Sequence, residues 1–164
     1  MRITARSAAL LAGFILLLGP AGCRHDDSLE PNDTYETATP LTIGAEVLAT
    51  AMQGNPDVFS VEAPMGRTLV FRLRYLGQED CPEFTLLGPK ETVVYEDHEG
   101  FCTDPWKAKT KAEGVSASGG RRTGYEFRIA VKETGKYFLR IRERKQADNP
   151  FAYSWDYGLT ASIE

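Results

Sequence analysis

Apolar and polar side chains alternate with a period of two over most of this chain, and this pattern restricts the fold more than any other feature. In residues 68–76, Leu69, Phe71, Leu73 and Tyr75 alternate with Val70, Arg72 and Arg74. Successive side chains of a β-strand point to opposite faces, so one set enters a core and the other faces water. The same alternation predicts strands over residues 125–131, 137–142 and 153–163.

Shorter runs of the same kind are bounded by residues typical of turns. They cover residues 46–51, 58–62, 83–87 and 92–95. About eight such strands, without an amphipathic helical pattern, predict an all-β antiparallel two-sheet β-sandwich. Residues 97–124 form the one long irregular segment, and loops of that length are usually functional or disordered. We expect its Ser/Gly part, residues 116–120, to be mobile.

The first 22 residues have the order of an export signal. Arg2 and Arg6 precede an apolar run over residues 8–18. That run is shorter than the roughly 20 residues that a membrane-spanning helix needs. The segment is therefore interpreted as a leader rather than a transmembrane helix.

A cysteine follows the leader directly. Leu18, Ala21, Gly22 and Cys23 resemble a bacterial lipobox, in which the cysteine thiol is acylated and the preceding segment is removed. The resemblance predicts a lipoprotein with signal peptide 1–22 and Cys23 as the lipidation site. Pro20 stands where that motif usually has leucine, so ordinary cleavage and secretion remain the alternative.

Residues 23–39 are polar and predict a tether that joins the membrane to a single domain over residues 40–164. Acyl chains would hold the protein persistently in the membrane, at about 0.8 kcal/mol per buried methylene. In the sorting rule of enterobacterial lipoproteins, aspartate after the lipidated cysteine retains the protein at the inner membrane. Arg24 stands there instead. The predicted location is the cell envelope, with the outer membrane favoured over the inner.

The two remaining cysteines, Cys81 and Cys102, lie in polar, Pro- and Gly-bearing surroundings. An even pair in an oxidising compartment predicts a disulfide, worth about 3 kcal/mol for a loop of this length. Two separate buried thiols are the alternative.

A net charge of −4 at pH 7 makes nucleic acid an unsuitable partner.

Several short segments together resemble the bacterial pre-peptidase C-terminal domain. They are residues 30–33 (EPND), 37–41 (TATPL), 57–64 (DVFSVEAP), 66–69 (GRTL), 134–140 (TGKYFLR) and 157–160 (YGLT). The resemblance spans the predicted domain, although residues 77–124 depart from the family pattern. It implies a jelly-roll-like sandwich that is itself non-catalytic and usually accompanies exported enzymes. Some relatives bind a protein target.

The same resemblance implies a calcium site, because some relatives bind this ion between the acidic N-terminal segment and the loop before an early strand. The matching positions are Glu30, Asn32, Asp33, Asn55 and Asp57. Carboxylate and amide oxygens are ligands that Ca²⁺ accepts. Asn55 stands where relatives often have aspartate, which removes a charge. The alternative is a surface turn and a strand cap that need no ion.

Two further groups of side chains suggest binding surfaces. If the strands that carry them were neighbours, several strand arginines would form a basic stripe for acidic glycans or lipid headgroups. The alternative is that these arginines pair with acidic side chains such as Glu126, Glu143 and Asp156. These arginines are Arg72, Arg74, Arg140, Arg142 and Arg144. The aromatic side chains of Tyr153, Trp155 and Tyr157 would form a stacking platform or, on their apolar face, part of the core.

Catalytic patterns are weak. Ser116 lacks the second glycine of a nucleophile elbow, and His98 has no identifiable nucleophile. The sequence therefore predicts no enzyme. It predicts a lipid-anchored binding or structural module of the envelope, with an envelope protein or polysaccharide as partner and no required cofactor apart from the implied calcium. The alternative is a secreted accessory domain that assists a separate exported protease or other hydrolase.

Overall fold

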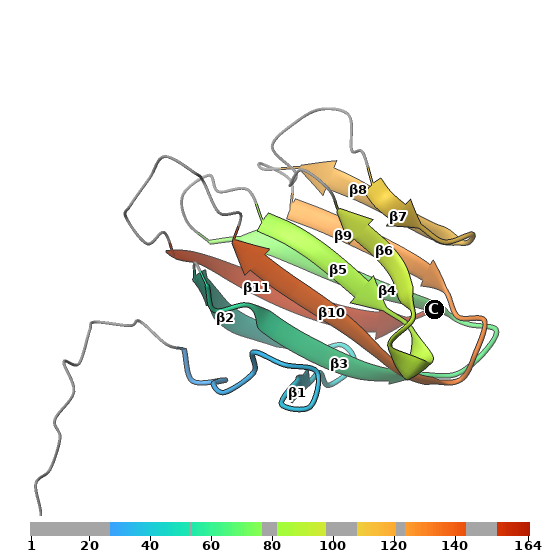
Figure 1. The fold of residues 1–164 in the computed structure, drawn as a ribbon, viewed down its shortest axis with the longest axis horizontal. Coiled ribbons are helices and arrows are strands. Elements are labelled where there is room, and N and C mark those ends of the chain that lie inside the picture. Colours follow the sequence, from blue (N-terminus) through green and yellow to red (C-terminus); the bar gives the residue numbers. More distant parts are fainter. Residues whose placement is uncertain (1–26, 53, 77–81, 98–107, 121–123, 144–153) are drawn as a thin grey trace, which may run out of the picture.

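The chain folds into two β-sheets packed face to face (Figure 1). The computed structural model describes residues 27–52, 54–76, 82–97, 108–120, 124–143 and 154–164. The six-stranded sheet has the order β1 (Thr39–Pro40), β3 (Asp57–Ala63), β10 (Gly135–Glu143), β5 (Pro82–Leu87), β6 (Val93–Asp97) and β7 (Ala108–Lys111). The five-stranded sheet has the order β2 (Glu46–Met52), β11 (Ser154–Ile163), β4 (Thr68–Tyr75), β9 (Gly124–Ala130) and β8 (Val115–Gly120).

Neighbouring strands pair antiparallel, apart from the short β1, which runs parallel to β3. The hairpins β5–β6–β7 and β8–β9 each remain within one sheet, and a 3₁₀ turn (Pro89–Glu91) links β5 to β6. Every other connection joins strands of different sheets. The predicted antiparallel two-sheet β-sandwich is confirmed.

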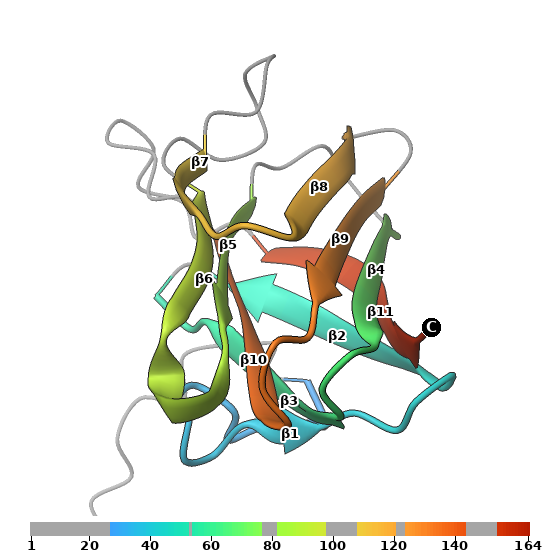
Figure 2. The same cartoon turned by 90° about the vertical axis from the view of Figure 1, so that its right-hand side faces the viewer.

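The core lies between the sheets and consists largely of apolar side chains predicted from the alternation, joined by others such as Leu41 and Val115. In β4, Leu69, Phe71 and Leu73 are buried, whereas Arg72 and Arg74 are exposed. Aromatic rings from both sheets meet in tilted or edge-on contacts, with Phe84 of β5 centred 4.9 Å from Phe127 of β9. Figure 2 shows the two layers from the side, with β10 and β4 in opposite sheets.

The expectation of an irregular segment over residues 97–124 is wrong in part. Residues 108–111 and 115–120 form β7 and β8, which extend the two sheets at one side of the sandwich. β8 has the sequence VSASGG and pairs with β9 from Val115 opposite Ile129 to Gly120 opposite Gly124. Small residues give little alternation to recognise, so pairing with β9 decides the conformation of this segment.

An N-terminal arm, which we define as residues 27–40, lies against the sandwich (Figure 1). Its Tyr35 ring stands edge-on to Phe138 of β10, with centroids 5.4 Å apart. Tyr35 and Ala38 cover a small apolar cluster on the outer face of the six-stranded sheet that contains Val58, Leu87 and Phe138. The arm includes most of the predicted tether, and it is folded onto the domain by the burial of these side chains.

No helix in the described parts of the chain is long and apolar enough to cross a membrane. The predicted leader and Cys23 lie outside the described residues.

Candidate functional sites: an acidic cluster and a polar pocket

The arm brings an acidic cluster to the start of β3. Asn32 is fully buried, and its carbonyl accepts a 2.8 Å hydrogen bond from the Val58 amide. Glu30 accepts one hydrogen bond from the Asn32 amide at 3.0 Å and another from Nδ2 of Asn55 at 2.6 Å. Asp57 is fully buried at the first position of β3 and accepts a hydrogen bond from the Tyr157 hydroxyl of β11.

The cluster concentrates negative charge around a buried carboxyl group. Burial raises the pKa of Asp57 to about 7, the Tyr157 hydrogen bond opposes this, and the carboxylates of Asp27, Glu30 and Asp33 add to it. Burial also raises the pKa of Glu30, with Asp33 and Asp27 contributing, against hydrogen bonds from Asn32 and Asn55. Burial raises the pKa of Tyr157 well above its usual value, so this hydroxyl stays protonated and donates.

Three buried polar atoms of the cluster have no hydrogen-bond partner: Oδ1 and Nδ2 of Asn32, and Oδ1 of Asp57. Burying polar atoms without partners costs about 1–3 kcal/mol for each group. The two oxygens are hard ligands, and the surrounding carboxylates favour a cation, so the donor chemistry fits Ca²⁺. Within the described part of the chain, however, no three side chains of His, Cys, Asp or Glu are grouped to hold a metal by themselves. Amide oxygens would have to contribute to such a site.

The structure thus brings together the residues that the resemblance singled out. Asn55 contacts Glu30 directly, and Asp33 is exposed but acts electrostatically on both Glu30 and Asp57. Sequence reasoning missed Asp27, whose carboxylate accepts hydrogen bonds from the Leu29 and Thr50 amides at 2.8 and 2.7 Å. In the sequence, Asp27 is marked as a candidate ligand only by its position in the polar stretch before Glu30.

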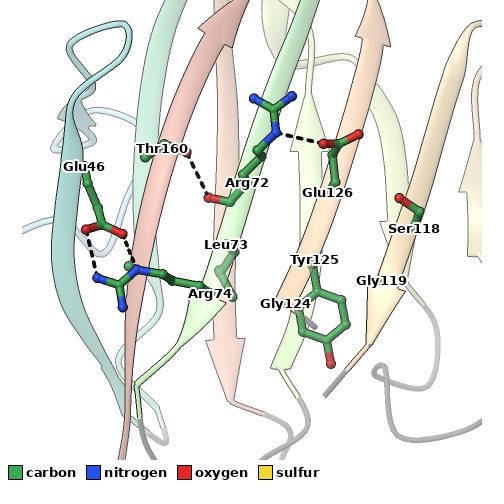
Figure 3. Close-up of a pocket in the computed structure, with 11 residues that line it drawn as sticks. Glu46, Arg72, Leu73, Arg74, Ser118, Gly119, Gly124, Tyr125, Glu126 and Thr160 are labelled. Atoms are coloured by element: carbon green, nitrogen blue, oxygen red, sulfur yellow. Dashed lines mark hydrogen bonds and ion pairs between the residues drawn. The ribbon is translucent and has the colours of Figure 1, made fainter. Parts of the chain in front are cut away.

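A second feature is a polar pocket on the outer face of the five-stranded sheet (Figure 3), with a volume of about 490 Å³. Arg74 donates to Glu46 through Nε at 2.5 Å and Nη2 at 2.9 Å. Arg72 donates to Glu126 through Nε at 2.8 Å, and also to Ser162 and Glu164. These four side chains form a rim of two cations and two anions.

Glycines leave the floor of this pocket without side chains. Gly158 stands at an outward position of β11, and a Cβ atom there would lie 2.4 Å from Oε1 of Glu46 and 3.0 Å from Nε of Arg74. Gly124 begins β9 with φ of +77°, and a Cβ atom there would lie 2.2 Å from the Leu73 carbonyl oxygen. Both glycines let neighbouring groups approach the sheet closely, and the sequence pattern alone did not reveal this pocket.

The predicted basic stripe does not form. Arg72 and Arg74 belong to β4 in the five-stranded sheet, whereas Arg140 and Arg142 belong to β10 in the other sheet. Arg142 pairs with Glu83, and Arg140 donates from Nη2 to Thr85 at 3.3 Å. The alternative of pairing with acidic side chains holds for Arg72, Arg74 and Arg142. Arg144 lies outside the described residues.

The other predicted features fall partly outside the described residues. Tyr157 is fully buried with its ring edge-on to Phe59, so it belongs to the core and to no stacking platform. Nothing is described of the side chains of Tyr153 and Trp155. Ser116 is exposed on β8. Cys23, Cys81, Cys102 and His98 lie outside the described residues, so lipidation and the disulfide stay predictions.

Comparison with known proteins gives similar folds but no family assignment, since the sequence matches no protein-family model and no curated protein. A periplasmic inhibitor of g-type lysozyme, PliG from Aeromonas hydrophila, aligns with a TM-score of 0.49 at 13% identity, over 77% of this chain and 96% of that chain. PliG from Salmonella Typhimurium gives 0.44 at 11%, over 76% and 98%.

The pre-peptidase C-terminal domain of a collagenase from Bacillus anthracis gives a TM-score of 0.48 at 10% identity, over 76% of this chain and 94% of that domain. At these identities, the likeness concerns the arrangement of the strands alone.

Proposed function

We propose that this protein is a lipid-anchored, non-catalytic binding or structural module of the bacterial cell envelope. The observation that carries the proposal is the docked arm. Asp27, which comes only four residues after Cys23 in the sequence, accepts a hydrogen bond from the Thr50 amide of the edge strand β2. Four residues span at most about 14 Å, so an acylated Cys23 would keep the sandwich next to the membrane.

The chemistry of the pocket supports binding rather than catalysis. Hydrogen bonding to Arg74 lowers the pKa of Glu46, so this carboxylate stays ionised and accepts hydrogen bonds. A general acid needs the opposite shift, towards the working pH. Arg72 and Arg74 are likewise held by carboxylates. The pocket offers fixed donors and acceptors to a ligand.

Calcium is the second part of the proposal. Glu30, Asn32, Asp33, Asn55 and Asp57 would hold the ion, which would supply positive charge to the cluster. The orphaned oxygens of Asn32 and Asp57 and the repulsion between the surrounding carboxylates support this assignment. Since Glu30, Asn32 and Asp33 belong to the arm, Asn55 lies in the turn before β3 and Asp57 begins β3, the ion would fasten the arm to the sandwich.

One sequence feature favours the alternative of a secreted accessory domain for a separate exported protease or other hydrolase. Pro20 occupies the usual leucine position of the lipobox, which suits cleavage without lipidation. In that case the same domain would work in solution beside its enzyme.

Metabolic labelling with a radioactive fatty acid separates these two functions. We expect label on the wild-type protein and on Cys102→Ser, and none on Cys23→Ser, because only Cys23 follows the leader. Fractionation of the same cells should place the labelled protein with the outer membrane. Unlabelled wild-type protein in the medium would instead establish the secreted form.

Thermal melting tests calcium. We expect a higher melting temperature in millimolar Ca²⁺ than in chelator, because an ion that binds only the folded state stabilises it. Asp57→Asn should reduce this difference. Glu62→Gln, which changes an exposed carboxylate on the same strand, should keep it. Identical wild-type melting temperatures with and without the ion would end the calcium assignment.

A further inference from the structure

The rim and floor of the polar pocket indicate what class of ligand it takes. Two guanidinium groups and two carboxylates face one hollow that crosses the five-stranded sheet (Figure 3). We propose that this pocket binds an uncharged glycan chain. The inference deepens the proposed function, because it names a ligand class for the envelope module.

Charge balance excludes a strongly ionic ligand. Arg74 is neutralised by Glu46, and Arg72 and Arg128 share the carboxylates of Glu126 and Glu164. A polyanion would have to break these pairs or lie against their carboxylates, which repel it. A sugar hydroxyl is both donor and acceptor. It can accept from a guanidinium and donate to the neighbouring carboxylate without separating the pair.

The guanidinium of Arg74 is held in a bidentate ion pair. Both carboxylate oxygens of Glu46 hold it from one side, at 2.5 and 2.9 Å. This fork fixes the plane of the guanidinium, so a ligand would order little of it on binding. Its remaining N–H groups extend beyond the contacts with Glu46, and they are the donors that we assign to sugar oxygens.

Gly158 decides how the ion pair lies on the sheet. Outward side chains normally cover the face of a sheet, but at Gly158 of β11 the Glu46 and Arg74 side chains occupy the space where a Cβ atom would stand, so the pair lies low across β11 between β2 and β4. The volume of about 490 Å³ lies within the usual range of ligand pockets, about 300–1,000 Å³. The hollow runs across the strands and is open to solvent, which suits an extended chain more than a compact molecule.

Isothermal titration of the full-length protein in detergent micelles tests the inference with three probes: a tetramer of N-acetylglucosamine, cellotetraose and heparin. We expect at least one of the two uncharged oligosaccharides to bind, with a Kd between micromolar and millimolar. We expect no binding of heparin. Failure of both uncharged probes, or binding of heparin in competition with them, would overturn the proposal.

Three variants locate the binding. Arg74→Ala removes the donors, and Gly158→Ala adds a methyl group where Glu46 and Arg74 meet, so each should weaken binding by tenfold or more. Arg142→Ala removes an ion-paired strand arginine from the outer face of the other sheet and should bind as wild type. Equal losses in Arg142→Ala and Arg74→Ala would contradict the assignment. Circular dichroism of each variant separates lost binding from lost folding.

The outcome of the glycan titration does not depend on whether Cys23 is acylated. Sugar binding in micelles does not require an acylated Cys23, and fatty-acid labelling does not require a working pocket. Failure of one test therefore leaves the other interpretable.

Discussion

The Asp57 carboxyl group links the acidity of the solution to the stability of the fold. It is buried beside Tyr157 and among the carboxylates of the arm, and its pKa is raised from 3.8 to about 7. An unfolded chain releases this proton near pH 4, whereas the folded chain keeps it to about pH 7. Between these values the folded state binds more protons, so its stability falls as the pH rises.

We predict that, in the presence of a chelator, the free energy of unfolding decreases from about pH 4 to about pH 7. Above pH 7, Asp57 should contribute no further change. A shift of this size corresponds to an effect on the order of 4 kcal/mol at most. Asp57→Asn keeps an acceptor for Tyr157 but cannot ionise, so its urea unfolding should depend less on pH. An unchanged slope in Asp57→Asn would show that another group is responsible.

A position can require glycine for its backbone conformation or for lack of space, and Gly44 and Gly124 differ in this respect. Both have positive φ, +77° and +80°, but a Cβ atom at Gly124 would lie 2.2 Å from the Leu73 carbonyl oxygen, whereas at Gly44 nothing lies within 4 Å. We predict that Gly44→Ala costs about 1 kcal/mol, from backbone strain alone. Gly124→Ala should cost clearly more, because the β4–β9 pair must separate. Equal losses in denaturant unfolding would mean that the clash is relieved without cost.

At the scale of elements, the arm is held by contacts at its first residue and in its middle. Asp27 accepts hydrogen bonds from the Leu29 and Thr50 amides, and Tyr35 packs on Phe138 further along. Phe138 stands on the outward side of β10, where the alternation predicts a side chain facing water. The arm removes this ring from water, so that it is only 9% exposed.

Tyr35→Ala tests this contribution. We predict a loss of about 1–3 kcal/mol from the lost apolar burial and ring contact. Amide hydrogen exchange should also become faster across residues 27–40. Lys136→Ala changes an exposed side chain of β10, the strand that carries Phe138, and should alter neither property. Unchanged exchange in Tyr35→Ala would mean that the ring does not hold the arm.

The sequence allowed the central strands to be predicted because their alternation is strong, as in Leu69, Phe71 and Leu73 of β4. It did not reveal β8, whose small residues carry almost no pattern. It also treated most of the arm as a tether, because the contacts that dock it, such as Tyr35 on Phe138, join distant residues. The carboxylates of the cluster came from a family resemblance, but the burial of Asp57 and its bond with Tyr157 required the fold.

At the scale of the whole molecule, the two outer faces differ. The arm covers the apolar cluster around Phe138 on the six-stranded sheet, whereas the polar pocket lies on the five-stranded sheet. If Cys23 is acylated, the short connection from Cys23 to Asp27 would place the sandwich at the membrane. This arrangement suits a module that holds or recognises another envelope component.

Mass spectrometry of the mature amino terminus, on protein extracted from membranes, tests this account most directly. We predict that the first residue is Cys23 and that its mass includes acyl chains. A mature protein that begins at residue 22 or 23 with an unmodified thiol, or that retains residues 1–22, would contradict the anchored module.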